Sequence, residues 1–167
     1  MDDSLSVLYG YLEVAVEKLQ LISAHDALIL FKSCLGGPKL QYVLRTSPCC
    51  GHSILTQFDD LLHRSAVTKI CNTSLTDDQW IQASLPVWPG GLGVRSVSKL
   101  ASTAFLASAA GTRTLQAQIR RKSLAADEET SAPLNHWQSL SGLPAGDVLP
   151  VGSQRVLDSV VVGHIFE

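Results

Sequence analysis

The chain has 167 residues, of which 46% are hydrophobic and 17% are charged, and its formal net charge is −2. This length allows a domain with a real core, and the composition excludes a largely disordered chain. The net charge gives no general attraction to nucleic acid or to an acidic membrane. A nucleic-acid role therefore requires a local basic patch.

Two features predict an intracellular protein with no membrane partner. No segment has the run of apolar residues that a membrane-spanning helix needs. The first ten residues, MDDSLSVLYG, are acidic where a signal peptide would be basic. In such a compartment we expect the four cysteines to be reduced: Cys34, Cys49, Cys50 and Cys71.

Apolar residues recur at intervals of three and four along the first half of the chain, which predicts helices joined by short loops. The clearest runs cover residues 5–19, 27–35 and 54–70. Ser23 is a predicted helix cap, with Asp26 three residues later. The Gly-Gly-Pro sequence at 36–38 predicts the end of one helix and the start of the next.

A capping box, Thr76 with Gln79, predicts a short helix that carries Trp80 and Ile81. The glycine-rich stretch PVWPGGLGVRS follows at 86–96. Ser96 is then the predicted cap of a helix that runs through Leu106.

Beyond residue 110 the chain becomes more polar, and the strand-type alternation of apolar residues is nearly absent throughout. The predicted fold is therefore mainly α: an array of short-loop helices with a glycine-rich turn near 89–95 and a loosely ordered C-terminal tail. The predicted divisions are a helical domain at 1–122, a mobile polar linker at 123–133 and a weakly helical tail at 134–167.

Asp59 and Asp60, in the sequence QFDD, resemble a polymerase metal site only superficially. Two-metal catalysis needs carboxylates that converge on one point. Adjacent residues of a helix point about 100° apart, so the pair is interpreted as a solvated helix face rather than as a metal site.

The sequence CCGH at 49–52, together with His63 and Cys71, contains residue types that bind zinc. Its spacing matches no paired Cys-x-x-Cys pattern. A cysteine–histidine nucleophilic pair also lacks a third group to orient it. The favoured interpretation is a loop with partly buried thiols, so we expect no metal and no cofactor.

Gly90, Gly91 and Gly93 do not form a dinucleotide-binding fingerprint, because the spacing is wrong and no acidic residue follows at the required distance. Glycine also serves where the backbone needs a positive φ angle or a close approach. These three residues are therefore predicted to form a structural turn.

Basic residues cluster after the glycine-rich stretch. Such a cluster can contact phosphates, although it is also typical of a solvated helix end. The candidate weak nucleic-acid-binding residues are Arg95, Arg113, Arg120, Arg121 and Lys122.

Three segments resemble the region after the polymerase palm in reverse transcriptases of non-LTR retrotransposons: AHDALILFKSCLGGPKLQYVLRTSPC, FDDLL and DDQWIQASLPVWPGGLGVRSVSKLASTAFLAS. The sequences LNHWQSLSG and QRVLDS resemble further downstream sequence of such reading frames. The resemblance runs from His25 to Asp158, and QASLPVWPGGLGVRS is its strongest motif.

The resemblance implies a helical, thumb-like part of a larger enzyme, which helps to hold the primer–template duplex and lacks the catalytic aspartates. The expected partners are an RNA–DNA or DNA duplex backbone, and a polymerase palm or another protein. QFDD lacks one residue of the family's catalytic hairpin motif, so no metal role passes to it. The alternative is a helical protein-interaction domain retained by a host, while an independent small enzyme is disfavoured.

Overall fold

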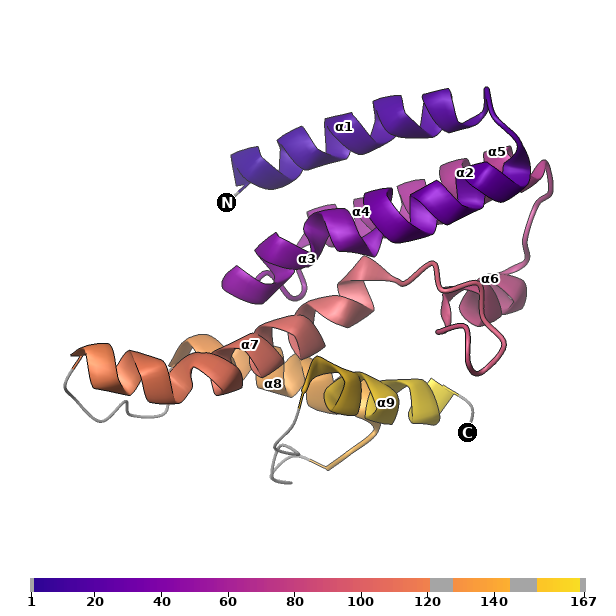
Figure 1. The fold of residues 1–167 in the computed structure, drawn as a ribbon. Helices are drawn as coiled ribbons and strands as arrows, with labels where there is room; N and C mark the ends of the chain where they lie inside the picture. The colour runs from indigo at the N-terminus through magenta and orange to yellow at the C-terminus, as the bar shows by residue number, and fades with distance from the viewer. Residues whose placement is uncertain (1, 121–127, 145–152, 166–167) are drawn as a thin grey trace. The chain divides into compact units, whose positions relative to one another are not determined.

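The computed structural model describes residues 2–120, 128–144 and 153–165 (Figure 1). This part of the chain is mainly helical and contains no strand. The mainly α fold predicted from the apolar periodicity is therefore confirmed.

The chain divides into two compact units. Unit 1 combines Met1–Gln41 with His52–Val97, and unit 2 combines Tyr42–Gly51 with Ser98–Glu167. Each unit thus joins segments that are separated in the sequence, which differs from the predicted divisions at 122 and 134.

Unit 1 begins with helices whose ends follow the predicted signals. Ser23 caps the second helix, since its Oγ accepts a hydrogen bond from the Asp26 amide at 3.2 Å. Gly36 ends the π-helical segment that follows, and the next helix starts at once and continues into unit 2. The bounds are α1 (Asp2–Leu19), α2 (Ala24–Leu30), η1 (Phe31–Leu35) and α3 (Gly37–Thr46).

The predicted helix at 54–70 is present, but its middle part is π-helical. It consists of α4 (Ser53–Asp60), η2 (Leu61–Val67) and α5 (Thr68–Cys71). Both Leu61 and Leu62 are buried, although adjacent side chains of a regular α-helix point about 100° apart. The wider π-helical turn re-aims side chains relative to that period, and periodicity alone does not reveal it.

α1 packs against α4, η1 and η2, while α2 packs against α5. The buried face of α1 carries Leu5, Leu12, Val16 and Leu19, which is the predicted stripe without its Leu8 and Ala15. Tyr9 adds an edge-to-face contact with Phe58 of α4, with ring centroids 5.3 Å apart. Unit 1 ends with α6 (Asp77–Ser84) and the segment that leads to Val97.

Unit 2 is built from α7 (Val97–Arg120), α8 (Glu128–Ser141) and α9 (Gln154–Ile165), with α8 packed against α9. Its buried cluster contains Leu106, Trp137, Leu157 and Val161. The indole N–H of Trp137 donates to the Leu157 carbonyl at 3.1 Å.

This arrangement corrects two predictions about the C-terminal part. The predicted linker at 123–133 is helical from Glu128 onward, with Pro133 inside α8, while residues 123–127 lie outside the described residues. The predicted loose tail at 134–167 supplies core side chains to unit 2. Trp137 explains the difference, because one large buried aromatic ring organises helices whose apolar periodicity is weak.

Candidate functional site

The glycine-rich turn follows α6, whose start is the predicted capping box. The Gln79 amide donates to Thr76 Oγ1 at 3.3 Å, and the Thr76 amide donates to Gln79 Oε1 at 2.9 Å. α6 ends at Ser84, and Leu85, which follows it, has an extended backbone. The turn is therefore anchored to a helix with a defined start and end.

The three glycines of the turn occupy positions that restrict side chains. Gly90 has a φ of 92° and Gly93 a φ of 75°, both in the left-handed region. Gly91 has an ordinary φ, but a Cβ there would overlap the backbone carbonyl of Leu85. A Cβ on Gly93 would also lie 2.8 Å from Lys32 Cε and 3.3 Å from Val87 Cγ2. Each glycine thus meets a local backbone requirement, either a positive φ angle or a close approach.

The amide groups of the turn are used within it. The Gly90 amide donates to the Val87 carbonyl at 3.0 Å, and the Gly93 amide donates to the Leu85 carbonyl at 2.9 Å. The amides between them donate to the carbonyls of Pro86 and Ala83 in the same way. A phosphate-binding loop instead aims its amides at the ligand, so this turn does not have that geometry.

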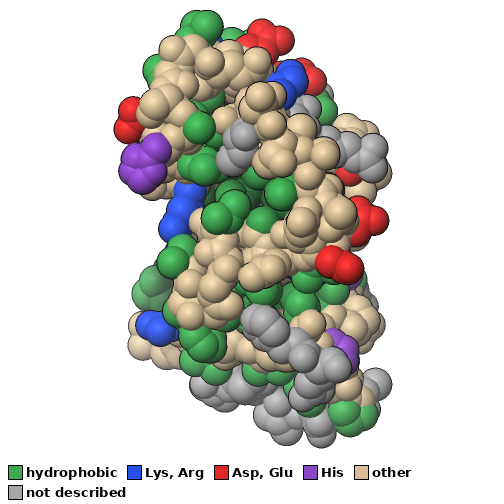
Figure 2. All heavy atoms as spheres, turned by 90° about the vertical axis from the view of Figure 1, so that its right-hand side faces the viewer, with side chains coloured by type: hydrophobic (Ala, Val, Ile, Leu, Met, Phe, Trp, Pro, Cys, Tyr) green, Lys and Arg blue, Asp and Glu red, His purple; other side chains and the backbone are tan. Residues whose placement is uncertain are grey.

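The side chains of the turn are unusually exposed for their type. Trp88 exposes 78% of its surface, Val87 56% and Leu92 46%. Figure 2 faces the side on which Figure 1 draws α6 and the turn, and hydrophobic side chains are visible at the surface of that face. The glycines thus serve the backbone of the turn, while apolar side chains form part of its exposed surface.

Asp59 occupies a position that its sequence context did not reveal. Its Oδ1 accepts a hydrogen bond from the Val97 amide at 2.6 Å, and its Oδ2 accepts one from Ser96 Oγ at 2.8 Å. The carboxylate therefore lies at the first turn of α7, where a negative charge interacts favourably with the helix dipole. Asp59 is only partly exposed while Asp60 is exposed, so the prediction of one solvated face for both was wrong for Asp59.

The predicted nucleic-acid-binding residues are not gathered at one described point. Arg95 is only partly exposed and belongs to unit 1, whereas Arg113 is exposed on α7 in unit 2. Arg120 is the last residue of α7, and its side chain lies outside what the structure describes, as do Arg121 and Lys122.

These basic residues lie within a long segment of the sequence that contains no acidic residue. No Asp or Glu occurs between Gln79 and Ala126, although the chain contains 15 acidic residues. Six of its 13 basic residues lie in this acid-free segment: Arg95, Lys99, Arg113, Arg120, Arg121 and Lys122. The acid-free segment (79–126) contains both the glycine-rich turn and the whole of α7, and a count of charge along the chain would have revealed it.

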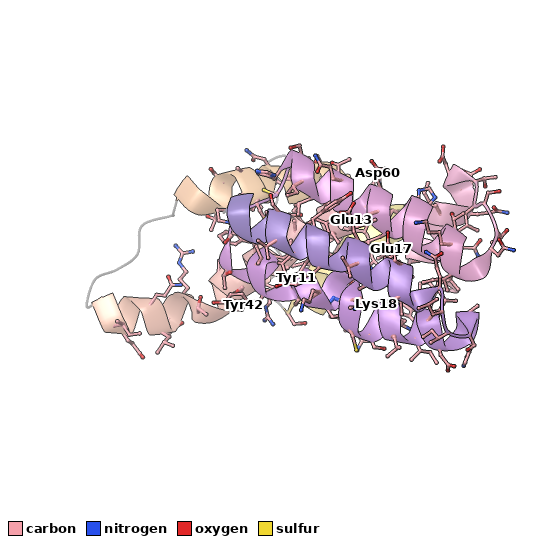
Figure 3. The ribbon with its side chains drawn as sticks, turned by 90° about the horizontal axis from the view of Figure 1, so that it is seen from above. Tyr11, Glu13, Glu17, Lys18, Tyr42 and Asp60 are labelled. Carbon is pink, nitrogen blue, oxygen red and sulfur yellow. The ribbon has the colours of Figure 1, made fainter. Side chains whose placement is uncertain are left out.

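Carboxylates instead gather on unit 1 around α1. Figure 3 places Glu13 and Glu17 on the side of α1 toward Asp60, and Tyr11 and Lys18 on its other side. Burial, followed by the negative charges of Glu13 and Asp60, raises the pKa of the nearby Tyr9 hydroxyl. Within the described residues no group of three His, Cys, Asp or Glu side chains is placed to hold a metal ion.

Several residues of the CCGH sequence, together with His63, have described contacts or pKa shifts that do not involve a metal ion. Burial raises the pKa of the Cys49 and Cys50 thiols, which disfavours the reactive thiolate. His52 Nδ1 accepts a hydrogen bond from the Ile54 amide at 3.2 Å and so caps α4. His63 stacks on Trp80, with ring centroids 4.3 Å apart. The described contacts of these groups are thus structural.

Among the described residues, no helix combines the length and apolarity needed to cross a membrane. Comparison of the chain with protein-family models, with curated proteins and with solved structures gave no match.

Proposed function

We propose that the chain is a non-catalytic part of a non-LTR retrotransposon-type reverse transcriptase, with a thumb-like role in holding primer–template duplex. The proposal rests on the resemblance that centres on QASLPVWPGGLGVRS. The observation that favours a nucleic-acid role is the acid-free segment (79–126), which carries a local charge of +6 in a chain whose net charge is −2.

The end of α7 is suited to contact with a phosphate backbone. From Ala110 to Ile119 every residue of α7 except Ala117 is exposed. Arg113 and Arg120 are seven residues apart, close to two helical turns, so their backbone positions share one face of the helix. Arg113 is exposed on this face, and a basic helix face can follow a charged backbone without reading bases.

The test is a gel-shift titration of an RNA–DNA hybrid at several salt concentrations. We expect weak binding that declines with salt, with a slope of about one unit for each phosphate contact. Replacing Arg120, Arg121 and Lys122 with serine removes up to three such contacts and flattens the slope. The matched control replaces the exposed Lys18, Lys39 and Lys69 with serine, which changes the net charge equally. Equal slopes for both triple variants, or binding that ignores salt, would contradict the proposal.

The same proposal expects no polymerase activity from these 167 residues, because a thumb-like region does not carry the catalytic aspartates. Primer extension with magnesium or manganese should give no product. Nucleotide incorporation that disappears in Asp59→Ala and Asp60→Ala variants would refute this part of the proposal.

The alternative is a helical protein-interaction domain, and one observation favours it. Val7, Tyr11 and Val14 are exposed on α1, and together with Lys18 they are spaced by four, three and four residues. This spacing is typical of a helix–helix seam. Absence of hybrid binding at low salt, together with normal folding, would favour this alternative over the thumb-like role.

A further inference from the structure

Trp88 exposes more of its surface than any other aromatic residue that the structure describes. Exposure of a large apolar ring to water is unfavourable by the same effect that drives burial. The other two tryptophans differ, since Trp137 is 1% exposed and Trp80 is partly covered and stacked on His63. Packing within unit 1 therefore does not account for the exposed position of Trp88.

The turn presents Trp88 on a constrained backbone. The hydrogen bond from Gly90 to Val87 closes a β-turn with Trp88 and Pro89 at its central positions. Proline fixes its own φ angle, and the close approach of Gly91 to Leu85 leaves no room for a Cβ. A preorganised aromatic ring loses little conformational entropy on binding.

The charges near the turn suit an anionic ligand. Lys32 Nζ would lie 3.2 Å from a Cβ on Gly93, and Val87 Cγ2 would lie 3.3 Å from the same point. The Lys32 ammonium group is thus close to Gly93 of the glycine-rich turn. The turn also lies in the acid-free segment (79–126), and the nearest carboxylates before it in sequence are Asp77 and Asp78 at the opposite end of α6.

The exposed apolar surface of the turn is centred on one large ring. Val87, Trp88 and Leu92 are its exposed apolar side chains, and only Trp88 among them is aromatic. An exposed indole ring and an ammonium group on the same turn region suit a base and an adjoining phosphate. Aromatic rings of this kind stack bases of any sequence, and neighbouring cations contact the backbone.

We propose that Trp88 stacks on an unpaired base of a single-stranded nucleic acid and that Lys32 contacts an adjoining phosphate. The proposal extends the proposed function, because both assume a nucleic-acid ligand. It uses a different surface, since duplex binding was assigned to the exposed end of α7.

The experiment titrates the full chain with a single-stranded oligothymidine and follows tryptophan fluorescence together with the anisotropy of a labelled oligonucleotide. We expect quenching, because Trp88 is the tryptophan most open to a stacking base. An abasic oligonucleotide with the same phosphates should bind more weakly and should quench little. Equal quenching by the two would overturn the stacking assignment.

Substitutions distinguish stacking on a base from nonspecific binding of the oligonucleotide. Trp88→Leu keeps an apolar side chain without an aromatic face and should weaken oligothymidine binding roughly 5- to 100-fold. Trp88→Phe should retain most of the affinity, and Lys32→Ser should lower the salt slope by about 0.7. Leu21→Ser, an exposed apolar position between α1 and α2, is the control and should bind like the parent. Parental affinity in Trp88→Leu, or no oligothymidine binding by the parent chain, would overturn the proposal and favour a protein ligand for the turn.

The two proposals can fail separately. Loss of oligothymidine binding in Trp88→Leu with unchanged hybrid binding supports the Trp88 site on its own. Hybrid binding that depends on Arg120, Arg121 and Lys122 but is accompanied by no oligothymidine binding retains the thumb-like role and rejects the Trp88 site.

Discussion

Removal of the Asp59 carboxylate tests the contact that fixes the start of α7. In Asp59→Ala the Val97 amide loses its acceptor at 2.6 Å, and the Ser96 hydroxyl loses its acceptor at 2.8 Å. Val97 is 0% exposed, so water cannot readily replace the acceptor. Leaving a buried donor unsatisfied costs about 1–3 kcal/mol, and loss of negative charge at a helix N-terminus adds about 0.3–1 kcal/mol.

The expected loss in the free energy of unfolding is therefore roughly 2–3 kcal/mol. For a chain of this size that corresponds to a decrease in Tm of roughly 4–12 °C. Asp59→Asn keeps an oxygen acceptor for the Val97 amide but loses the charge, so its decrease should be smaller.

Thermal and urea unfolding followed by far-ultraviolet circular dichroism measures these differences. Asp60→Ala is the matched control, since Asp60 is the adjacent residue with the same side chain and is exposed. It should change stability by less than about 0.5 kcal/mol. If Asp59→Ala and Asp60→Ala were equally stable, the capping role of Asp59 would be refuted.

Three further substitutions test other parts of the structure. Gly91→Ala should destabilise the protein by more than about 1 kcal/mol, because its Cβ would overlap the Leu85 carbonyl. Gly10→Ala should stabilise it by about 0.5–1 kcal/mol, because Gly10 lies in the middle of α1 with space for a Cβ. Urea titrations that gave both changes the same sign would contradict this. Trp137→Phe should lower stability by about 1–3 kcal/mol, because the Leu157 carbonyl loses its donor in the core of unit 2; a stability equal to that of the parent would count against that core. Burial lowers the pKa of His136 below 6.5, so the unfolded chain binds the proton more readily and stability should fall as the pH drops below about 6.5; His136→Gln should reduce that dependence, and an unchanged pH profile would show that the ring is not responsible.

Short-range sequence patterns predicted many of the helices and some of their ends. Ser23 and the Thr76–Gln79 capping box act through side chains within three residues of the amides that they satisfy, so sequence reading could place them. The stripe of α1 was predictable in the same way, because the 3.6-residue period alone determines which positions share a face. The π-helical part at Leu61–Val67 departs from that period, and an apolar pattern does not reveal it.

Contacts between distant segments could not be predicted in this way. Asp59 and Val97 are 38 residues apart, and nothing near QFDD indicates that one carboxylate caps another helix while its neighbour faces solvent. The helical nature of residues 128–133, the first part of α8, was missed for a related reason. Its sequence is polar and contains a proline, and burial of Trp137 in unit 2 outweighs that local preference.

The sequence by itself determined the mainly α class, the helix caps at Ser23 and Thr76 and the concentration of positive charge between Gln79 and Ala126, because each depends on residue type and short-range spacing. Only the tertiary structure decided which segments form each unit, that the amides of the glycine-rich turn are used internally and that Trp88 remains exposed. Burial and hydrogen bonding are properties of the packed chain, so one tryptophan lies in a core, as Trp137 does, and another lies at a surface, as Trp88 does.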